Sequence, residues 1–525
     1  MDFEELLDGA EVLSRQGNAP INGLDYDSRR IGRGYAFVAM RGETTDGNKY
    51  IDQAIEKGAT AVVTDSLEQA MRPNVAWAVV QHGRRALARL SANYYRKPAE
   101  RLRVTGVTGT NGKTTTTFIV EAILQAAKRK NALVGTVEYH LPNQTLAAPH
   151  TTPEALELNQ IFAKAIGLGA TEAVMEVSSH ALEQQRVFGV PFEVAIFTNL
   201  TRDHLDYHKT MENYFASKKI LFTGCGTEPP RCAVLNADDE YGRELAKFSK
   251  SKSAEVFTYG IEAGDFHTEK LEMMPGGNRF DLVTPSGTIP LFSPLIGRVN
   301  VYNVLAACAA AYGRECKAEE IAKGIEGMRR VPGRFEKVDE GQPFAVVVDY
   351  AHTDDALKNL TRLAREFVSR GCDCPCHDGR AKVLHPVPCC DRTYQKIERG
   401  RVITVFGCGG DRDRAKRPLM GEAAGRGSDF VIVTADNPRS EDPVAIINDS
   451  MPGLQRAGTK YVMEPDRRKA IALALDEASA GDMVLIAGKG HEKTQTTREG
   501  VFPFDDFEVA REELKKLGYE KGTEA

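Results

Sequence analysis

The chain has 525 residues, which predicts about three domains, because one hydrophobic core rarely organises more than about 250 to 300 residues. Hydrophobic residues make up 42% and charged residues 27%, as in ordinary globular proteins. The net charge of −5 argues against binding nucleic acid through a basic surface. The acidic start, residues 1–5, lacks the features of a signal peptide, and no apolar run approaches the ~18 residues of a membrane helix. We therefore expect a cytoplasmic protein without nucleic-acid partners or membrane insertion.

Residues 1–100 alternate strand-like and helix-like stretches, which is typical of an α/β domain. The expected strands are 35–40, 61–63 and 76–80, and the expected helices are 50–58 and 84–95. Asp27-Ser28-Arg29 forms a polar loop of the kind that carries ligand sites in such domains, although an ordinary turn accounts for it as well. Pro98 and the charged residues after it predict a linker.

A phosphate-binding loop is predicted where a β-branched strand at 104–107 runs into a glycine-rich turn and then a helix at 115–127. Lys113 of this turn is suited to the β- and γ-phosphates of a nucleotide, and the hydroxyl of Thr114 to magnesium. Val107 stands where the general pattern has its first glycine, so an ordinary glycine turn remains the alternative.

Two further apolar strands of the central segment end in polar clusters. The stretch 173–180 carries the carboxylate of Glu176, and the stretch 196–208 ends in several Asp and His residues. Oxygen and imidazole ligands near a nucleotide favour magnesium over zinc, while a helix cap at Asp203 with solvated histidines is the simpler alternative. The pattern of the helix at 211–221 places Lys218 on the surface. Helices are also expected at 301–312 and 321–328.

The last segment repeats the strand–helix rhythm after a boundary at 331–334. A buried strand is expected at 345–349, and three further apolar strands are expected at 402–406, 430–434 and 483–487. Each of these three ends in a glycine-rich or charged loop, the form of an open sheet with its site at the carboxyl edge. We predict an α/β chain of three domains, with a mostly parallel P-loop-type central sheet and a Rossmann-like C-terminal domain.

A cysteine-rich insertion at 371–400 interrupts this last segment. Thiolate and imidazole groups there have the chemistry of a Zn²⁺ site, but their spacing matches no standard knuckle. A disordered insertion and a redox-sensing loop are the alternatives. The residues concerned are Cys372, Cys374, Cys376, His377, His385, Cys389 and Cys390.

The motifs at 109–114, 176–180, 201–208 and 349–352 resemble those of the Mur ligases of peptidoglycan synthesis, and the resemblance spans nearly the whole chain outside 371–400. It implies an ADP-forming acid–amino-acid ligase that makes an amide through an acyl phosphate, in cell-wall biogenesis and hence cell shape and division. It also implies a UDP-MurNAc-binding domain at 1–100, a central ATP-binding domain at 101–332 and an amino-acid-binding domain at 333–525.

The same resemblance implies roles for individual residues. The implied catalytic residues are Lys113, Glu176, His204 and Lys218. The implied magnesium ligands are Thr114, Glu176, His204 and Lys218 as a carbamate. The implied ATP-binding residues are Gly109, Thr110, Asn111, Gly112, Lys113, Thr114, Thr115, Asn300 and His352, with Asn303 in the same segment as Asn300. The implied residues for the UDP-MurNAc-dipeptide are Ser28, Thr151, Thr152, Ser178, Gln184 and Arg186.

The amino acid added is predicted from Arg439, because a guanidinium grips a carboxylate in two places and repels an ammonium group. Arg439 is the last of four residues, 436–439, that the resemblance ties to meso-diaminopimelate. The distal end of this amino acid carries a carboxylate. The implied pocket is Arg412, Asp436, Asn437, Pro438, Arg439, Gly488 and Glu492. The expected substrates are ATP, UDP-MurNAc-L-Ala-D-Glu and meso-diaminopimelate, and we expect a monomer.

Three alternatives remain open at this point. A sister ligase would add L-lysine or another amine, a regulatory nucleotide-binding protein would share only the loop, and folylpolyglutamate synthetase has a related core. Arg439 argues against the first, and the cluster at 176–208 with the three loops of the last domain argues against the second. The N-terminal segment and residues 436–439 argue against the third.

Overall fold

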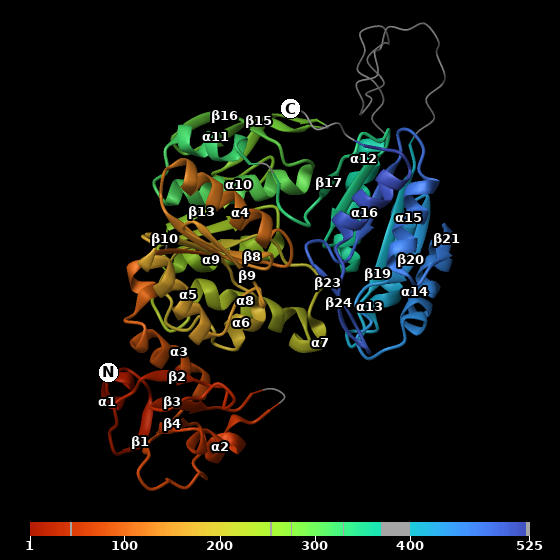
Figure 1. Cartoon of the computed structure of the whole chain (residues 1–525). Coiled ribbons are helices and arrows are strands. Elements are labelled where there is room, and N and C mark those ends of the chain that lie inside the picture. The colour runs from red at the N-terminus through yellow and green to blue at the C-terminus, as the bar shows by residue number, and fades with distance from the viewer. Residues whose placement is uncertain (43–44, 253–254, 275, 329, 369–399, 521–525) are drawn as a thin grey trace, which may run out of the picture.

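The computed structural model describes residues 1–42, 45–252, 255–274, 276–328, 330–368 and 400–520. Figure 1 shows three parts in chain order, with the N-terminal part beneath the central part and the C-terminal part beside it. The zinc, disorder and redox predictions fall on Cys372 to Cys390, which lie outside the described residues.

The N-terminal part is built on a five-stranded sheet in the order β1-β5-β4-β3-β2, in which only β1 runs antiparallel to its neighbour. Its strands are Val12–Gln16, Gly23–Asp25, Tyr35–Ala39, Ala59–Thr64 and Ala76–Val80, and its helices are α1 (Phe3–Leu6), α2 (Ile51–Glu56) and α3 (Gly83–Tyr94). Apolar side chains of β3, β4 and β5 are buried on both faces of the sheet. The expected linker is a short 3₁₀ helix, Pro98–Arg101, whose Pro98 and Ala99 are buried.

The central part holds an eight-stranded sheet in the order β13-β12-β11-β6-β10-β7-β8-β9, parallel except for the β8–β9 hairpin. Its strands are β6 (Arg103–Thr108), β7 (Asn131–Val134), β8 (Glu138–Leu141), β9 (Gln144–Ala147), β10 (Glu172–Glu176), β11 (Phe192–Phe197), β12 (Cys232–Asn236) and β13 (Glu255–Tyr259). Strand β6 lies between β10 and β11, so the loops after these three strands meet at one sheet edge.

Helices cover both faces of this sheet. One face packs against α4 (Lys113–Ala126), α10 (Arg298–Gly313) and α11 (Ala318–Glu326). The other packs against α5 (Ala155–Gly167), α6 (Ser179–Glu183), α8 (Met211–Thr223) and α9 (Glu240–Ser251). A small antiparallel sheet, β14 (His267–Met274), β15 (Gly277–Thr284) and β16 (Gly287–Ser293), extends the first layer.

The C-terminal part has a six-stranded sheet in the order β17-β18-β22-β19-β20-β21, parallel except for β17. Its strands are β17 (Glu336–Val338), β18 (Ala345–Asp349), β19 (Val402–Cys408), β20 (Phe430–Ala435), β21 (Lys460–Met463) and β22 (Met483–Ala487). Helices α12 (Asp354–Val368), α13 (Lys416–Gly427) and α14 (Pro443–Ala457) cover one face, and α15 (Arg467–Glu477) and α16 (Asp506–Lys516) the other. The predicted α/β class and mostly parallel sheets are confirmed.

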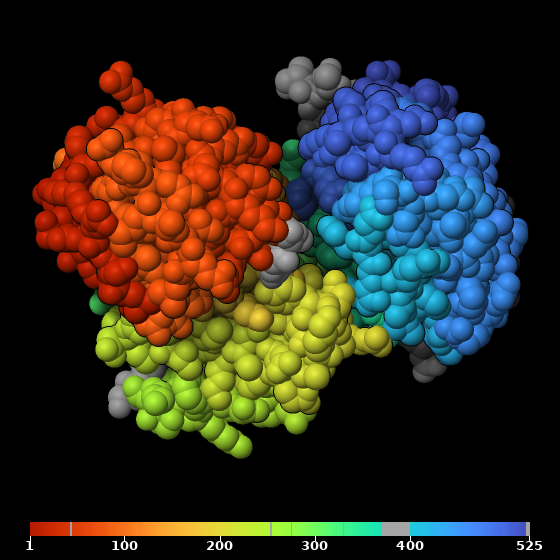
Figure 2. Space-filling view, turned by 90° about the horizontal axis from the view of Figure 1, so that it is seen from below, coloured from red at the N-terminus to blue at the C-terminus, as the bar shows by residue number. Residues whose placement is uncertain are grey.

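Polar contacts hold the N-terminal part to α5 of the central part. Glu157 accepts hydrogen bonds from Tyr26 at 3.1 Å and Arg30 at 3.1 Å, and Arg84 pairs with Glu154 at 3.4 Å. Figure 2 shows a recess where the N-terminal part faces the other two. Among the described helices, none is long and apolar enough to cross a membrane.

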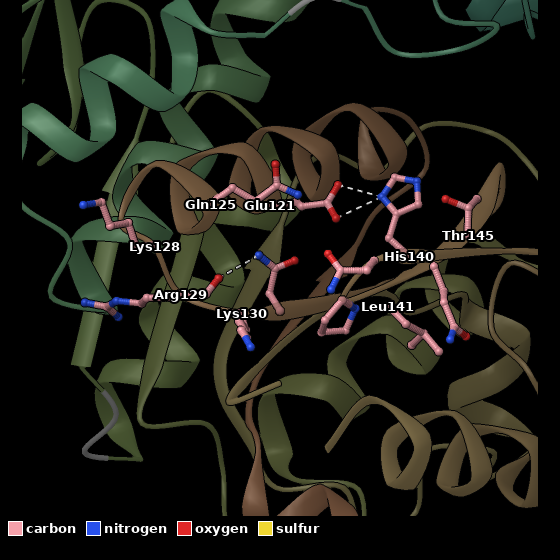
Figure 3. Close-up of a pocket in the computed structure, with 12 residues that line it drawn as sticks. Glu121, Gln125, Lys128, Arg129, Lys130, His140, Leu141 and Thr145 are labelled. Atoms are coloured by element: carbon pink, nitrogen blue, oxygen red, sulfur yellow. Dashed lines mark hydrogen bonds and ion pairs between the residues drawn. The ribbon is translucent and has the colours of Figure 1, made fainter. Parts of the chain in front are cut away.

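A histidine connects the β8–β9 hairpin to α4, the helix that follows the predicted phosphate loop. His140 on β8 lies 2.9 Å from both carboxylate oxygens of Glu121 on α4, and 2.8 Å from Glu138. Figure 3 shows this contact at the rim of a surface hollow of about 480 Å³. Burial lowers the pKa of His140, but hydrogen bonds and charge from the two glutamates raise it to about 9 overall.

This pair predicts a pH-dependent stability. Because the folded pKa is raised from 6.5 to about 9, the stabilisation is fully present below about pH 6.5 and is lost as the pH rises through about 9. We expect His140→Gln to lower the free energy of unfolding by about 1 to 2 kcal/mol near pH 6, after allowance for solvent screening, and by little near pH 10. Thermal melting at the two pH values measures this, with His267→Gln as control. Equal losses at both would contradict it.

Candidate active site

The loop after β6 has the conformation that its glycines predict. Gly109 has φ +149° and Gly112 has φ +86°, where other residues are strained. A Cβ on Gly109 would lie 1.9 Å from the hydroxyl of Thr198, and one on Gly112 would lie 2.4 Å from Oδ1 of Asn303. The glycines therefore allow the loop to lie against the end of β11 and the side of α10, and α4 starts directly after them.

The end of β11 braces this loop through polar contacts. Asn199 accepts from the main-chain N–H of Thr110 at 2.8 Å and, through its side chain, from the N–H of Asn111 at 2.9 Å. The Thr198 hydroxyl donates to the carbonyl of Asn111 at 2.6 Å. The two residues after β11 thus hold the loop in an open curve. A loop that binds phosphate through its main chain requires such a curve.

Two lysines converge on the same carbonyl of the loop. Lys113 donates to the carbonyls of Gly109 at 3.0 Å and Thr110 at 2.9 Å, and Lys218 on α8 donates to Gly109 at 2.8 Å. The surface position predicted for Lys218 is wrong, because its residue is only 1% exposed. Helix α8 is apolar around much of its circumference, so the pattern did not reveal which lysine turns inward. Burial lowers the pKa of Lys218 well below its usual value, and the charge of Lys113 adds to this.

Glu176 ends β10 fully buried, beside the loop. It accepts from the main-chain N–H of Thr136 at 2.8 Å and from the Thr136 hydroxyl at 3.0 Å. That hydroxyl lies 3.0 Å from the hydroxyl of Thr151, and Thr152 donates to the carbonyl of Glu176 at 2.9 Å. Thr136 follows the short strand β7 and was missed, because no motif marks it.

The remaining residues predicted for the dipeptide continue this network, with one exception. The main-chain N–H of Ser178 donates to Thr152 at 3.1 Å, while Arg186 donates to the carbonyl of Thr152 at 3.0 Å and to Gln184 at 2.7 Å. Ser28 stands apart in the N-terminal part, where it donates to Gln53 at 2.8 Å. The separation suits a long substrate that reaches from one part to the other.

Asp203 and His204 lie at the junction between the central and C-terminal parts. His204 has φ +53° and its ring lies 3.3 Å from the carboxylate of Asp203. Lys416, the first residue of α13, forms an ion pair with Asp203. Burial lowers the pKa of His204 despite the charge of Asp203, which leaves the imidazole neutral and able to act as a ligand.

Other C-terminal residues reach the loop and α4. Asp355 on α12 accepts from Asn111 at 2.9 Å and from Thr201 at 3.0 Å. Arg334 donates to the hydroxyl of Thr114 at 3.1 Å, although its segment was predicted only as a boundary. His352 lies on the same connection before α12, exposed, and bonds to the carbonyl of Tyr350 at 2.8 Å.

The remaining predicted nucleotide residues flank the loop. Asn300 and Asn303 lie one turn apart on α10 and are joined by a 3.0 Å hydrogen bond. Asn303 also accepts from Thr116 on α4 at 3.4 Å, and Thr115 is buried in the first turn of α4. The structure therefore brings the Asn300 segment against the loop helix.

The loops after β19, β20 and β22 meet at the carboxyl edge of the C-terminal sheet. Arg439 donates to the carbonyl of Gly410 at 2.8 Å, and Arg412 to the carbonyl of Asp411 at 3.2 Å. Among the described residues, neither guanidinium has a carboxylate within ion-pair distance. Burial and the charge of Arg412 lower the pKa of Arg439. Two neighbouring cations that lack a carboxylate within ion-pair distance among the described residues form a site suited to a carboxylate ligand.

Acidic and amide groups lie opposite these arginines. Asn437 donates to Glu492 at 2.7 Å, and Asp436 is buried below them. Gly488 has φ +118°, and a Cβ there would lie 2.5 Å from the Asp436 carboxylate. The carbonyl of Pro438 packs against Gly410. A Cβ on Gly410 would lie 1.9 Å from the carbonyl oxygen of Pro438. The pocket therefore has a cationic end and an anionic end.

Comparisons with known proteins agree on one family. The Mur ligase middle domain matches residues 107–311, the Mur ligase glutamate ligase domain matches 390–490, and the catalytic domain of the Mur ligase family matches 20–95. The chain is 48% identical to UDP-N-acetylmuramoyl-L-alanyl-D-glutamate–2,6-diaminopimelate ligase of Solibacter usitatus, over 95% of this chain and 94% of that protein. The chain belongs to the Mur ligase family.

Other Mur ligases extend this likeness. The enzyme of the same name from Geobacillus thermodenitrificans is 43% identical, over 96% of this chain and 97% of that protein. A solved structure of a 2,6-diaminopimelate ligase is 32% identical with a TM-score of 0.63, and the match covers 95% of this chain and 96% of that one.

The loop geometry predicts a strong effect of one methyl group in this Mur ligase. We expect Gly109→Ala to weaken ATP binding by at least about ten-fold and to cost about 1 to 3 kcal/mol of stability, because the methyl group displaces Thr198. Calorimetric titration with ATP and thermal melting measure both. Gly167→Ala is the matched control, since a Cβ there meets nothing within 4 Å. Unchanged ATP affinity in Gly109→Ala would refute the role of the loop.

Proposed function

We propose that this chain is the ATP-dependent ligase that adds meso-diaminopimelate to UDP-MurNAc-L-Ala-D-Glu in peptidoglycan synthesis. The observation that carries the proposal is the pair Arg412 and Arg439, two cations without a carboxylate within ion-pair distance among the described residues, on neighbouring loops at the carboxyl edge of the C-terminal sheet. Diaminopimelate has carboxylates to fill such a pocket, whereas the side chain of lysine ends in an ammonium group that these arginines would repel. The names of the relatives support the same substrate.

We assign the uridine end of the substrate to residues 1–100, ATP to 101–332 and the amino acid to 333–525. Ser28 would contact the uridine end, and Thr151, Thr152, Ser178, Gln184 and Arg186 the sugar and dipeptide. Asn300 and His352 would contact the nucleotide. Because the reaction uses ATP, we place the enzyme in the cytoplasm, and we propose that it acts as a monomer.

The first step in this proposal activates the D-glutamate carboxylate. One carboxylate oxygen attacks the γ-phosphorus, the bond from that phosphorus to the β–γ bridging oxygen breaks, and ADP leaves. This transfer depends on position and charge neutralisation more than on covalent help from the protein. The main-chain N–H groups of Gly112 and Lys113 and the ammonium of Lys113 would hold the phosphates, and Arg334, at Thr114, would add positive charge beside them.

The second step forms the amide. The amine of diaminopimelate attacks the acyl-phosphate carbonyl, the C–N bond forms, and inorganic phosphate leaves as the amine gives up a proton. The C-terminal loops would hold the amino acid through Arg412, Arg439 and Glu492 while the central part holds the acyl phosphate. Contacts of Asp355 and Lys416 with the central part keep the two sites facing each other.

Magnesium fits the residues expected to hold it. Glu176 is fully buried, accepts from Thr136 through both carboxylate oxygens and has no ion-pair partner among the described residues. Thr114 and His204 supply a hydroxyl and a neutral imidazole nearby. Among the described residues, no group of three His, Cys, Asp or Glu side chains forms a metal cage, which suits an ion that keeps most of its waters. When bound, magnesium would neutralise phosphate charge.

We propose that Lys218 is carbamylated. Its burial and lowered pKa favour the neutral amine, the form whose nitrogen lone pair attacks the carbon of CO₂ with release of a proton. The product is an anion beside Lys113, where a second ammonium group is unfavourable. As a carbamate the side chain would join Glu176 and His204 at the magnesium site.

Carbamylation of Lys218 predicts a ¹³C signal that depends on this one lysine. Protein equilibrated with ¹³C-bicarbonate should show a carbamate carbon by NMR, and Lys218→Met should lose this signal together with at least about 100-fold of kcat, because an anion of the site is missing. Lys219→Met, one residue away and only partly buried, should keep both. A carbamate signal that persists in Lys218→Met would contradict the assignment.

The deciding experiment measures ADP release with UDP-MurNAc-L-Ala-D-Glu and a panel of amino acids. We expect meso-diaminopimelate to give the highest kcat/KM. Arg439→Ala should lower that value by about 100-fold or more, because a buried charge contact to the carboxylate is lost, with a much smaller effect on ATP.

Arg456→Ala is the control, because Arg456 pairs with Glu422 on the surface. A preference for L-lysine would favour the sister ligase, and selectivity that survives Arg439→Ala would refute the specificity argument. ADP release that does not depend on the UDP-linked substrate would refute the function itself.

A further inference from the structure

Lys489 is a fully buried cation in the pocket of the C-terminal part, and the proposed reaction steps do not use it. It follows β22 and Gly488, and its side chain is 0% exposed. Burying an ammonium group costs several kcal/mol unless partners compensate. A buried lysine next to a substrate pocket therefore needs compensating contacts.

The contacts form a triangle. Nζ of Lys489 lies 3.0 Å from Oε2 of Glu492 and 3.1 Å from Oδ1 of Asn437. The same Oε2 accepts from Nδ2 of Asn437 at 2.7 Å. Oδ1 of Asn437 also accepts from the main-chain N–H of Thr496 at 2.9 Å, which fixes the orientation of the amide. Lys489 thus contacts both the amide of Asn437 and the carboxylate of Glu492, which also bond to each other.

The triangle leaves one oxygen of Glu492 available. Both bonds to its carboxylate end on Oε2, and Oε1 has no hydrogen-bond partner among the described residues. The side chain of Glu492 is 31% exposed, so this oxygen is within reach of a ligand. Burial raises the pKa of Glu492, but Lys489 and the amide of Asn437 lower it overall, so the carboxylate stays charged.

We propose that Lys489 is a positioning residue of the amino-acid pocket, whose ammonium orients the carboxylate of Glu492 and the amide of Asn437 toward the incoming diamino acid. The free oxygen of Glu492 then accepts from a substrate ammonium group, while Arg412 and Arg439 hold a carboxylate. The proposal rests on the proposed function and adds a residue that acts through Glu492. It predicts that the loss of Lys489 damages amino-acid binding and spares the phosphoryl transfer.

Lys489→Met tests this, because methionine has a similar length and no charge. We expect the KM for meso-diaminopimelate to rise by about ten-fold or more, with kcat and the KM values for ATP and UDP-MurNAc-L-Ala-D-Glu changed by less than about two-fold. Acyl phosphate trapped by hydroxylamine, which needs no amino acid, reports the first step in the same sample. Lys493→Met is the matched control, because Lys493 is exposed and pairs with Asp505.

A double-mutant cycle separates positioning from general support of the fold. If Lys489 acts through Glu492, the variant Lys489→Met/Glu492→Gln should lose no more kcat/KM than Glu492→Gln alone, whereas independent roles give additive losses. Additive losses, or an unchanged KM in Lys489→Met, overturn the proposal. If Lys489→Met yields no hydroxamate, Lys489→Gln replaces it, since its amide still donates to Asn437, and the same outcomes apply. Wild-type protein that yields no hydroxamate would instead contradict the proposed function.

Discussion

The main chain of residues 109–112 is held against the end of β11, and the rest of the site depends on that contact. Thr198 and Asn199 supply the hydrogen bonds, and the glycines supply the space that a side chain would occupy. The bracing residues directly follow β11, the strand next to β6 in the same sheet, so the contact ties the loop to the end of a neighbouring strand. Glu176, at the end of the neighbouring strand β10, is linked through Thr152 to Arg186, so the residues proposed for the dipeptide form one hydrogen-bonded network beside the loop.

The same edge of the central sheet also fixes the C-terminal part. Asp355, Lys416 and Arg334 come from three different elements, and each contacts a residue next to the loop. Their partners are polar groups of the site and not an apolar interface, so the two parts touch where the chemistry is expected. Two sheets with facing carboxyl edges then share one reaction space, which follows from the general position of ligand sites in parallel sheets.

The elements that the sequence predicted well are the buried parallel strands, such as β6 and β22, because short runs of about five apolar or β-branched residues that lead into a glycine-rich turn favour a buried strand over a helix. The antiparallel sheet β14–β16 was missed, since its strands mix polar and apolar residues. Individual residues were harder. Thr136 and Lys489 gain their roles from contacts 40 and 52 residues away along the chain, and no local pattern signals such contacts.

The protonation of the two buried lysines depends on the groups that surround them. Lys113 and Lys218 both donate to the carbonyl of Gly109, and Lys113 also donates to that of Thr110, but neutral carbonyl groups offset only part of the cost of burying two cations. Glu176 is the buried anion nearby, but threonine donors occupy its oxygens. Burial lowers the pKa of both lysines, and that of Lys218, the more deeply buried of the two, falls well below its usual value. A neutral Lys218 beside a charged Lys113 is the state that the proposed carbamylation requires. The carbonyl of Gly109 thus brings the two lysines together, and burial beside it lowers the pKa of both.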